Sequence, residues 1–175
     1  MKNVWLGVVG ASSLVLGVGI GMAASAKWPG IDAVQGKPPK EAAYSALEVA
    51  EKLAGKGSWE RLGVARVYYL SGDKARGQAI MDSVQAGEMK SSDWQRIGQI
   101  YADAGESPRA EQYFQNALNA DPKDDTGQSE IGAWYIRIGQ RDKGEALMAK
   151  AFARHPDEVW HYVRAAEAYL NIQPR

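Results

Sequence analysis

The sequence has no cysteine among its 175 residues, and it has no net charge, because 21 Lys and Arg residues balance 21 Asp and Glu residues. Without cysteine there is no disulfide, no thiolate metal site, no cysteine nucleophile and no lipid anchor on an N-terminal cysteine. Without net charge there is no field to steer the chain towards nucleic acid or anionic lipid. Stability must therefore come from packing, and 45% hydrophobic residues in a length typical of one domain are sufficient for a core.

Patterns typical of catalysis and metal binding are also missing. The sequence has no Gly-rich phosphate loop, no nucleophile elbow and no pair of catalytic acids. Its two histidines, His155 and His161, are six residues apart across a proline, whereas a helical metal pair needs a spacing of three or four. The acidic residues between 121 and 125 do not fit a calcium loop, because Pro122 would take the first ligand position. We therefore expect no enzyme activity, no cofactor and no metal site.

The first 26 residues have the features of a targeting segment. Lys2 is followed by 24 uncharged residues, and Ala24-Ser25-Ala26 is a small-residue site suited to signal peptidase. An uncleaved signal anchor at residues 4–24 is the alternative, because about 20 apolar residues can span a bilayer. We expect the remainder to be exported, either periplasmic or secreted after cleavage, or held at the inner membrane by the anchor. Residues 27–39 contain three prolines and two glycines, which predicts a linker.

A period of about 34 residues runs through the rest of the chain. Tyrosines recur with spacings of 33, 34 and 34 residues, and a glycine follows each of the first three tyrosines by four residues. The residues concerned are Tyr68, Tyr101, Tyr135, Tyr169, Gly72, Gly105 and Gly139. A period of this length in a helical sequence indicates stacked helical hairpins.

Residues 91–124 show how one such hairpin is encoded. Ser91 or Ser92 can cap a first helix, and Gly105 can end it, because a left-handed residue at a helix end is cheap only for glycine. The spacing of apolar residues puts Trp94, Ile97, Gly98, Tyr101 and Ala102 on one face of this helix. Ser107-Pro108 predicts the start of a second helix. Its packed side comprises Ala110, Phe114, Ala117 and Leu118.

The pattern resembles the tetratricopeptide repeat. The matching residues in this unit are Trp94, Ile97, Gly98, Tyr101, Ala110, Phe114, Ala117 and Pro122. Those in the next unit are Ile131, Gly132, Tyr135, Gly139, Gly144, Met148, Ala151 and Pro156. The resemblance implies an all-α fold, a right-handed superhelical stack of helical hairpins known as an α-solenoid. We expect this domain at residues 40–173, with eight helices: full repeats at about 58–91, 91–124 and 125–158, and a single helix at each end.

The resemblance also implies a function. In tetratricopeptide proteins the first helices of successive units line a concave groove, which receives an extended peptide or a partner helix. We therefore expect a protein-interaction scaffold or adaptor in the cell envelope, which assists complex assembly and contacts a membrane only through an uncleaved N-terminal segment. The implied groove residues are Trp59, Leu62, Arg66, Tyr69, Gln95, Gln99, Asp103, Arg137 and Trp160.

Two alternatives remain open from the sequence. The apolar residues Trp59, Leu62, Tyr69 and Leu70 can instead be buried under the N-terminal helix or the linker, because exposed apolar patches are uncommon unless they are functional. The chain can also be a self-oligomerising structural protein without a separate peptide ligand. The sequence does not identify a partner.

Overall fold

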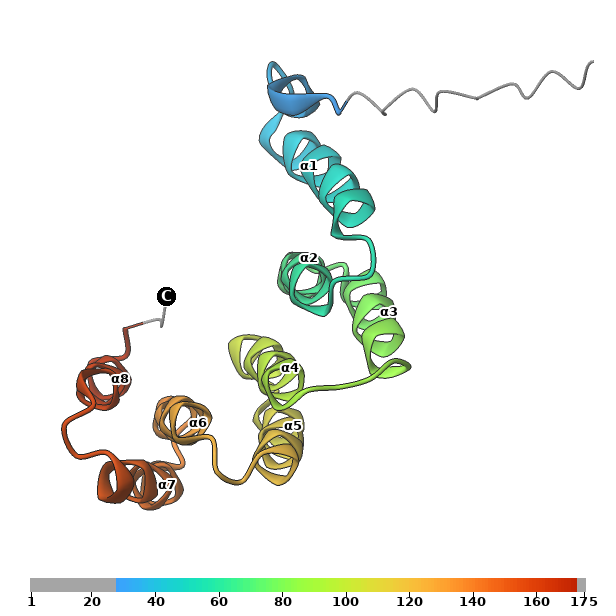
Figure 1. The fold of residues 1–175 in the computed structure, drawn as a ribbon. Helices are drawn as coiled ribbons and strands as arrows, with labels where there is room; N and C mark the ends of the chain where they lie inside the picture. Colours follow the sequence, from blue (N-terminus) through green and yellow to red (C-terminus); the bar gives the residue numbers. More distant parts are fainter. Residues whose placement is uncertain (1–27, 173–175) are drawn as a thin grey trace, which may run out of the picture.

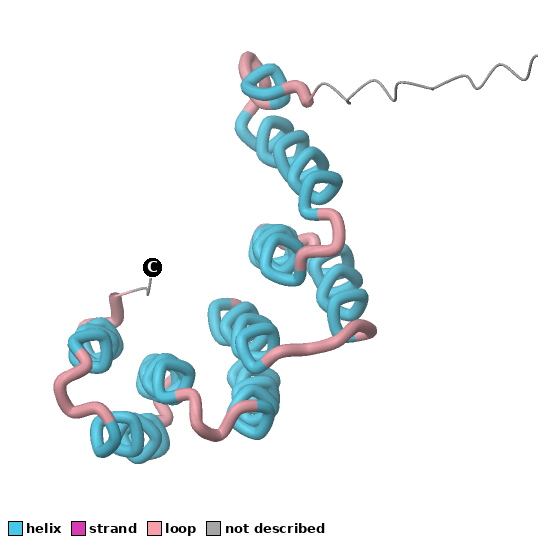
Figure 2. The backbone as a smooth tube through the Cα atoms, in the orientation of Figure 1, coloured by secondary structure: helices cyan, strands magenta, loops and turns pink. Residues whose placement is uncertain are grey.

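The structure is a computed structural model that describes residues 28–172 (Figure 1). The targeting segment predicted at residues 1–26 lies outside the described residues. The described part is all-α, as predicted, with eight α-helices, one short 3-10 helix and no strand (Figure 2). The elements are η1 (Gly30–Ala33), α1 (Pro39–Ala54), α2 (Ser58–Leu70), α3 (Lys74–Gln85), α4 (Ser91–Asp103), α5 (Ser107–Ala120), α6 (Asp125–Arg137), α7 (Arg141–Arg154) and α8 (Val159–Tyr169). The region predicted as a linker thus contains the 3-10 helix η1.

Consecutive helices pack as three hairpins, α2 with α3, α4 with α5 and α6 with α7. The single helix α1 precedes these hairpins and the single helix α8 follows them. The hairpins form a curved array, with α2, α4, α6 and α8 on its inner side and α3, α5 and α7 on its outer side (Figure 1). We call these two sets the inner and the outer helices. This packing is consistent with an α-solenoid, and the right-handed sense of the superhelix remains a prediction.

The ends of the inner helices follow from local sequence. The glycines after α2, α4 and α6 have φ angles of +103°, +75° and +86°, in the left-handed region, as their spacing predicted. At the start of α6 the carboxylate of Asp124 accepts the backbone N–H of Gly127 at 2.9 Å. The prediction that Ser91 or Ser92 caps α4 is wrong in detail. There the carboxylate of Asp93 accepts the backbone N–H of Lys90 at 3.0 Å, one residue before the helix.

Within each hairpin the two helices approach most closely at a pair of small residues. The pairs are Ala65 with Gly77, Gly98 with Ala110, and Gly132 with Gly144. A Cβ atom on Gly77 would lie 2.8 Å from the carbonyl oxygen of Ala65. A Cβ atom on Gly144 would lie 2.5 Å from the carbonyl oxygen of Gly132. The backbones therefore leave no room for a larger side chain at these positions.

The recurrent tyrosine connects each hairpin to its neighbours. Tyr101 is fully buried, and its ring centre lies 5.5 Å from that of Tyr69 in the preceding hairpin and 5.2 Å from that of Tyr113 in its own. Tyr135 is equally buried and packs edge-on against Phe114 of the preceding hairpin, with ring centres 5.6 Å apart. The core is therefore continuous along the array rather than confined to single hairpins.

Candidate binding face on the inner helices

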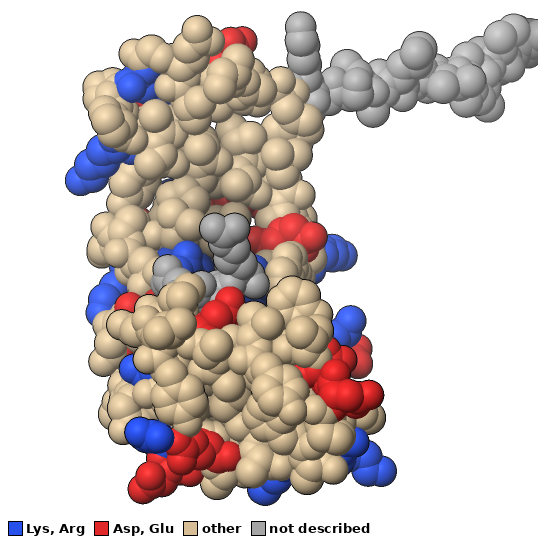
Figure 3. All heavy atoms as spheres, turned by 90° about the vertical axis from the view of Figure 1, so that its left-hand side faces the viewer, with Lys and Arg blue, Asp and Glu red and all other residues tan. Residues whose placement is uncertain are grey.

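The inner face is the side of α2, α4, α6 and α8 that is turned away from the outer helices. Figure 3 views the molecule from the open side of the curve, which contains this face. Basic and acidic side chains both appear there, and neither sign covers the visible surface (Figure 3). Recognition on this face must therefore depend on individual side chains rather than on a broad electrostatic field.

Polar contacts on the inner face join successive inner helices. Arg66 of α2 donates two hydrogen bonds to Asp103 of α4, at 2.8 and 3.1 Å. Glu130 of α6 accepts hydrogen bonds from Gln95 of α4 and from Arg164 of α8. The carboxylates of Asp103 and Glu130 are therefore each engaged by an arginine of a neighbouring helix.

Two further arginines of this face, Arg96 and Arg137, form no ion pair within residues 28–172. The guanidinium carbon of Arg96 in α4 lies 3.1 Å from the ring centre of Trp59 in α2. The guanidinium carbon of Arg137 in α6 lies 4.2 Å from the ring centre of Trp134. Within residues 28–172 neither guanidinium makes a hydrogen bond or an ion pair, and Nε and Nη1 of Arg137 are buried. Each guanidinium therefore lies over a tryptophan ring. The N–H groups of Arg96 are left for an acceptor, whereas in Arg137 only Nη2 is not buried.

The surroundings of Arg96 disfavour an additional positive charge. Burial lowers the pKa of Arg96 below its ordinary value of 12.5, and the nearby charge of Arg66 lowers this pKa further. The carboxylates of Glu60 and Asp93 act in the opposite direction. An arginine nevertheless stays protonated in a protein. The region between α2 and α4 therefore holds a partly desolvated positive charge that a carboxylate would stabilise.

The structure corrects part of the predicted groove. Leu62 and Tyr69 are buried in the core, so they are not available to a partner. The hydroxyl of Tyr69 donates to the carboxylate of Glu106 at 2.9 Å, which fixes this side chain towards the next hairpin. Two of the four apolar residues are therefore buried, but Tyr69 packs on Tyr101 of the next hairpin and not under the N-terminal helix. Trp59 is 62% exposed, and Leu70 is also exposed.

The other predicted residues are spread along the inner helices from α2 to α8. Arg66 and Asp103 lie together between α2 and α4, where Trp59 is also located. Gln95 is buried and bonded to Glu130, and Gln99 is half-buried. Arg137 stacks on Trp134 in the middle of the array, and Trp160 is 58% exposed on α8. The nine residues therefore do not form one patch.

The sequence analysis missed Arg96. It occupies the same place in its unit as Glu130 and Arg164 do in theirs, with spacings of 34 residues. The recurrence of a charged residue at this place was a signal that could have identified all three. Their contacts with neighbouring inner helices could not be read from the spacing alone, because each contact depends on side-chain direction.

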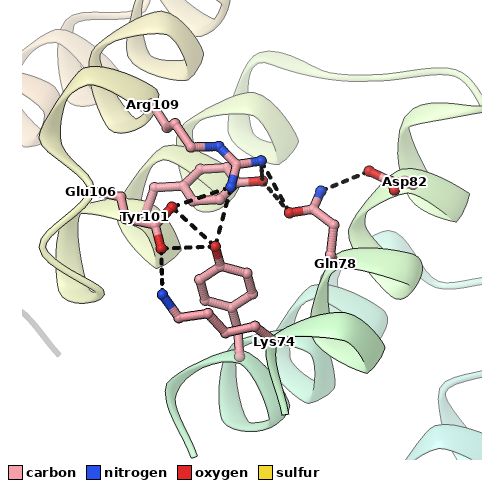
Figure 4. A network of polar contacts seen from close by, with 7 residues as sticks. Lys74, Gln78, Asp82, Tyr101, Glu106 and Arg109 are labelled. Carbon is pink, nitrogen blue, oxygen red and sulfur yellow. Dashed lines mark hydrogen bonds and ion pairs between the residues drawn. The ribbon is translucent and has the colours of Figure 1, made fainter. Parts of the chain in front are cut away.

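A separate polar network ties the outer side of the first two hairpins together (Figure 4). Glu106, which follows α4, accepts hydrogen bonds from Lys74 of α3 at 2.7 Å and from Arg109 of α5 at 3.2 Å. Tyr101 donates to Gln78 of α3 at 2.8 Å and accepts from Arg109 at 2.8 Å. The bond from Lys74 is the main reason why the pKa of Glu106 is lowered, and burial raises the pKa of Tyr101 to about 12. These charged groups are all paired within the protein, so we infer that the network stabilises the fold and does not bind a ligand.

The described residues contain neither a metal-binding cluster nor a membrane-spanning helix. No group of three or more His, Cys, Asp and Glu side chains there could hold a metal ion. His161 is buried, and His155 lies 3.0 Å from Asp125. No helix between residues 28 and 172 has the length and apolar character needed to cross a bilayer.

Comparisons of the chain with protein-family models, with curated proteins and with solved structures found no match. The tetratricopeptide resemblance therefore remains a prediction from the residues that carry it.

Proposed function

We propose that the chain is a tetratricopeptide-type scaffold or adaptor whose inner face binds an acidic peptide segment of a partner protein. The observation that supports this most is the pair of tryptophan-stacked arginines, Arg96 and Arg137, whose guanidinium groups make no hydrogen bond or ion pair within the described residues. A guanidinium presents a planar set of donors that matches a carboxylate, and stacking on a ring reduces the entropy lost when it binds.

Trp59 supplies the apolar part of this site. It is 62% exposed although it lies under the guanidinium of Arg96, so a ligand can contact the indole and the charge together. Tryptophan and arginine are enriched among residues that dominate binding energy. The preferred ligand is therefore a segment in which an Asp or Glu lies next to an apolar side chain.

The carboxylates of the inner face that are already hydrogen-bonded determine which ligands the site rejects. Asp103 and Glu130 already accept hydrogen bonds from Arg66 and Arg164, so they offer little to a basic ligand. A basic segment would also add positive charge beside Arg96, where the pKa is already lowered by burial and by Arg66. The site therefore discriminates against basic segments by repulsion as well as by missing contacts.

The test begins with selection of peptides from a displayed random library on the full chain in a mild detergent. We expect enrichment of Asp or Glu beside an aromatic or aliphatic residue. The affinity of one selected peptide is then measured by fluorescence anisotropy against wild type, Arg96→Gln and Arg137→Gln. A hydrogen bond to a charged group contributes about 1.5–3 kcal/mol, so each variant should bind about 10- to 150-fold more weakly.

The matched control is Arg141→Gln, which removes an exposed arginine of α7 that pairs with Glu145 outside the inner face. This variant should bind the peptide as wild type does, and far-ultraviolet circular dichroism should show unchanged helicity in all three variants. Selection of peptides without acidic residues, or equal affinities for wild type and both inner-face variants, would rule the proposal out.

A further inference from the structure

Within residues 28–172 the two single helices, α1 and α8, have no hairpin partner. In the 34-residue repeat, α8 corresponds to the first helix of a hairpin, and no second helix follows it within the described residues. Helix α1 corresponds to the second helix of a hairpin, and no first helix precedes it there. Tyr169 of α8 shows the consequence most directly. It is 50% exposed, whereas the three equivalent tyrosines, Tyr68, Tyr101 and Tyr135, are fully buried. In each of those units the outer helix that follows packs on the inner helix, whereas the only outer helix that Tyr169 contacts within residues 28–172 is the preceding one, α7, through Glu145 and Arg141.

The open side of α8 is the side that the other inner helices use for their own hairpin. Ala166 is exposed there, and the equivalent residues Ala65, Gly98 and Gly132 are all buried against an outer helix. Tyr162 and Leu170 add exposed apolar area to the same helix. The repeat itself therefore defines what would cover α8, namely a helix with a small residue opposite Ala166.

Helix α1 has the matching open side. Ala43 is exposed, although the equivalent residues Gly77, Ala110 and Gly144 are buried against an inner helix. Ala46 is exposed as well, while its equivalents in α3 and α7 are the buried residues Ile80 and Leu147. The opposite side of α1 is already used, because Leu47 is buried and Tyr44 packs against Tyr68 with ring centres 6.1 Å apart.

We propose that α1 of a second copy packs on α8 as α5 packs on α4, so that copies of the chain join head to tail. The two open sides lie at opposite ends of the array and cannot meet within one chain (Figure 1). The two copies use different surfaces, so the contact is heterologous and leaves one open α1 and one open α8 for further copies. This inference does not depend on the peptide proposed for the inner face.

Continuity of the inner face supports a second copy as the occupant. With α1 of the second copy in place, α2 of that copy becomes the next inner helix after α8. Trp59 and Trp160 hold the same place in their first helices and are both more than half exposed. They would lie next to each other across the junction, which would remove apolar area of both from water.

The junction is expected to be weaker than a hairpin within the chain. Each of the three hairpins has at least one glycine at its closest approach, whereas the junction would bring Ala43 against Ala166. Two Cβ atoms hold the backbones further apart than one or none, so fewer dispersion contacts form. Association should therefore be reversible and should increase with protein concentration.

The absence of cysteine allows a direct test with the full chain in a mild detergent. Two single-cysteine variants, Ala43→Cys and Ala166→Cys, are oxidised separately and as an equal mixture. Both positions are exposed, so neither change should disturb the fold, which circular dichroism checks. We expect a disulfide-linked dimer in the mixture at least tenfold faster than in either variant alone. The control mixture pairs Ala43→Cys with Ala153→Cys, at an exposed alanine of the outer helix α7.

The double variant Ala43→Cys/Ala166→Cys should form a ladder of linked oligomers, and light scattering of the wild type should show a mass that rises with concentration. Three results would overturn the proposal: equal rates in the test and control mixtures, faster linkage within one single variant than in the mixture, or a concentration-independent monomer. These readouts involve no peptide, so they separate this proposal from the one about the inner face.

Discussion

Tyr101 in the middle of the array and Tyr169 at its end occupy the same place in the repeat, yet their surroundings differ. Tyr101 is packed between rings of two hairpins and bonded through its hydroxyl to Gln78 and Arg109. The hydroxyl of Tyr169 is bonded to Glu145 of the preceding outer helix α7, and Arg141 of α7 lies over its ring. Within residues 28–172 no outer helix follows α8, and Tyr169 remains half exposed. The comparison shows that the repeat encodes the capacity to pack, and that a neighbouring helix decides whether this capacity stabilises the protein.

The largest expected effect is the loss of a buried tyrosine. Tyr101→Ala should lower the free energy of unfolding by about 3–5 kcal/mol, because it opens a cavity in the continuous core. Tyr169→Ala should cost less than about 1 kcal/mol at a protein concentration where the chain is monomeric, because this ring is half exposed. Urea unfolding followed by circular dichroism measures both values. Similar losses for the two variants would contradict the difference in packing described above.

A smaller difference is expected at the closest helix approach. A Cβ atom on Gly98 would lie 2.6 Å from the ring of Phe114 and 3.2 Å from the carbonyl oxygen of Ala110, so Gly98→Leu should destabilise by about 1–3 kcal/mol. The equivalent change in α8, Ala166→Leu, should alter stability by less than about 0.5 kcal/mol, because this side of α8 is open. Thermal melts of both variants decide the matter. An unchanged melt for Gly98→Leu would show that α4 and α5 do not pack in this register.

The smallest effect concerns acid stability of the network between the first two hairpins. The hydrogen bond from Lys74 and those from Tyr69 and Arg109 lower the pKa of Glu106 in the folded protein below its ordinary 4.5. A lowered folded pKa contributes stability above pH 4.5, and this contribution is lost as the pH falls through the folded value. Glu106→Gln should therefore lose less stability than wild type between pH 5 and pH 3, by less than about 1 kcal/mol because the carboxylate is partly solvated.

The control for this measurement is Glu167→Gln on α8, whose side chain makes no hydrogen bond within residues 28–172. Its stability should follow that of wild type across the same pH range. A steeper acid loss in Glu106→Gln than in wild type would show that Glu106 is not stabilised by its neighbours in the folded state.

The order of the helices could be predicted because its signals are local. Gly105 ends α4 and Pro108 lies in the first turn of α5, and each acts within a few residues. The contacts of the binding face are not local in this sense. Tyr69 is fixed by Glu106, which is 37 residues further along, and Trp59 is covered by Arg96 of the next unit. The repeat predicted which helices pack together. The side-chain contacts between these helices could not be predicted from the spacing and are seen only in the three-dimensional structure.

Contacts between neighbouring repeats, although not local within one helix, still join residues that are close in sequence compared with the length of the chain, which bears on how the chain folds. Among the described residues the longest side-chain hydrogen bond in sequence terms joins Arg109 to Tyr69, 40 residues apart. Chains with mainly local contacts have low contact order and fold quickly, and repeat arrays can nucleate at one unit and propagate to the next. A nascent polypeptide of this kind can form each hairpin soon after the residues of that hairpin leave the ribosome. Its apolar surfaces are then exposed only briefly, which leaves little time for aggregation.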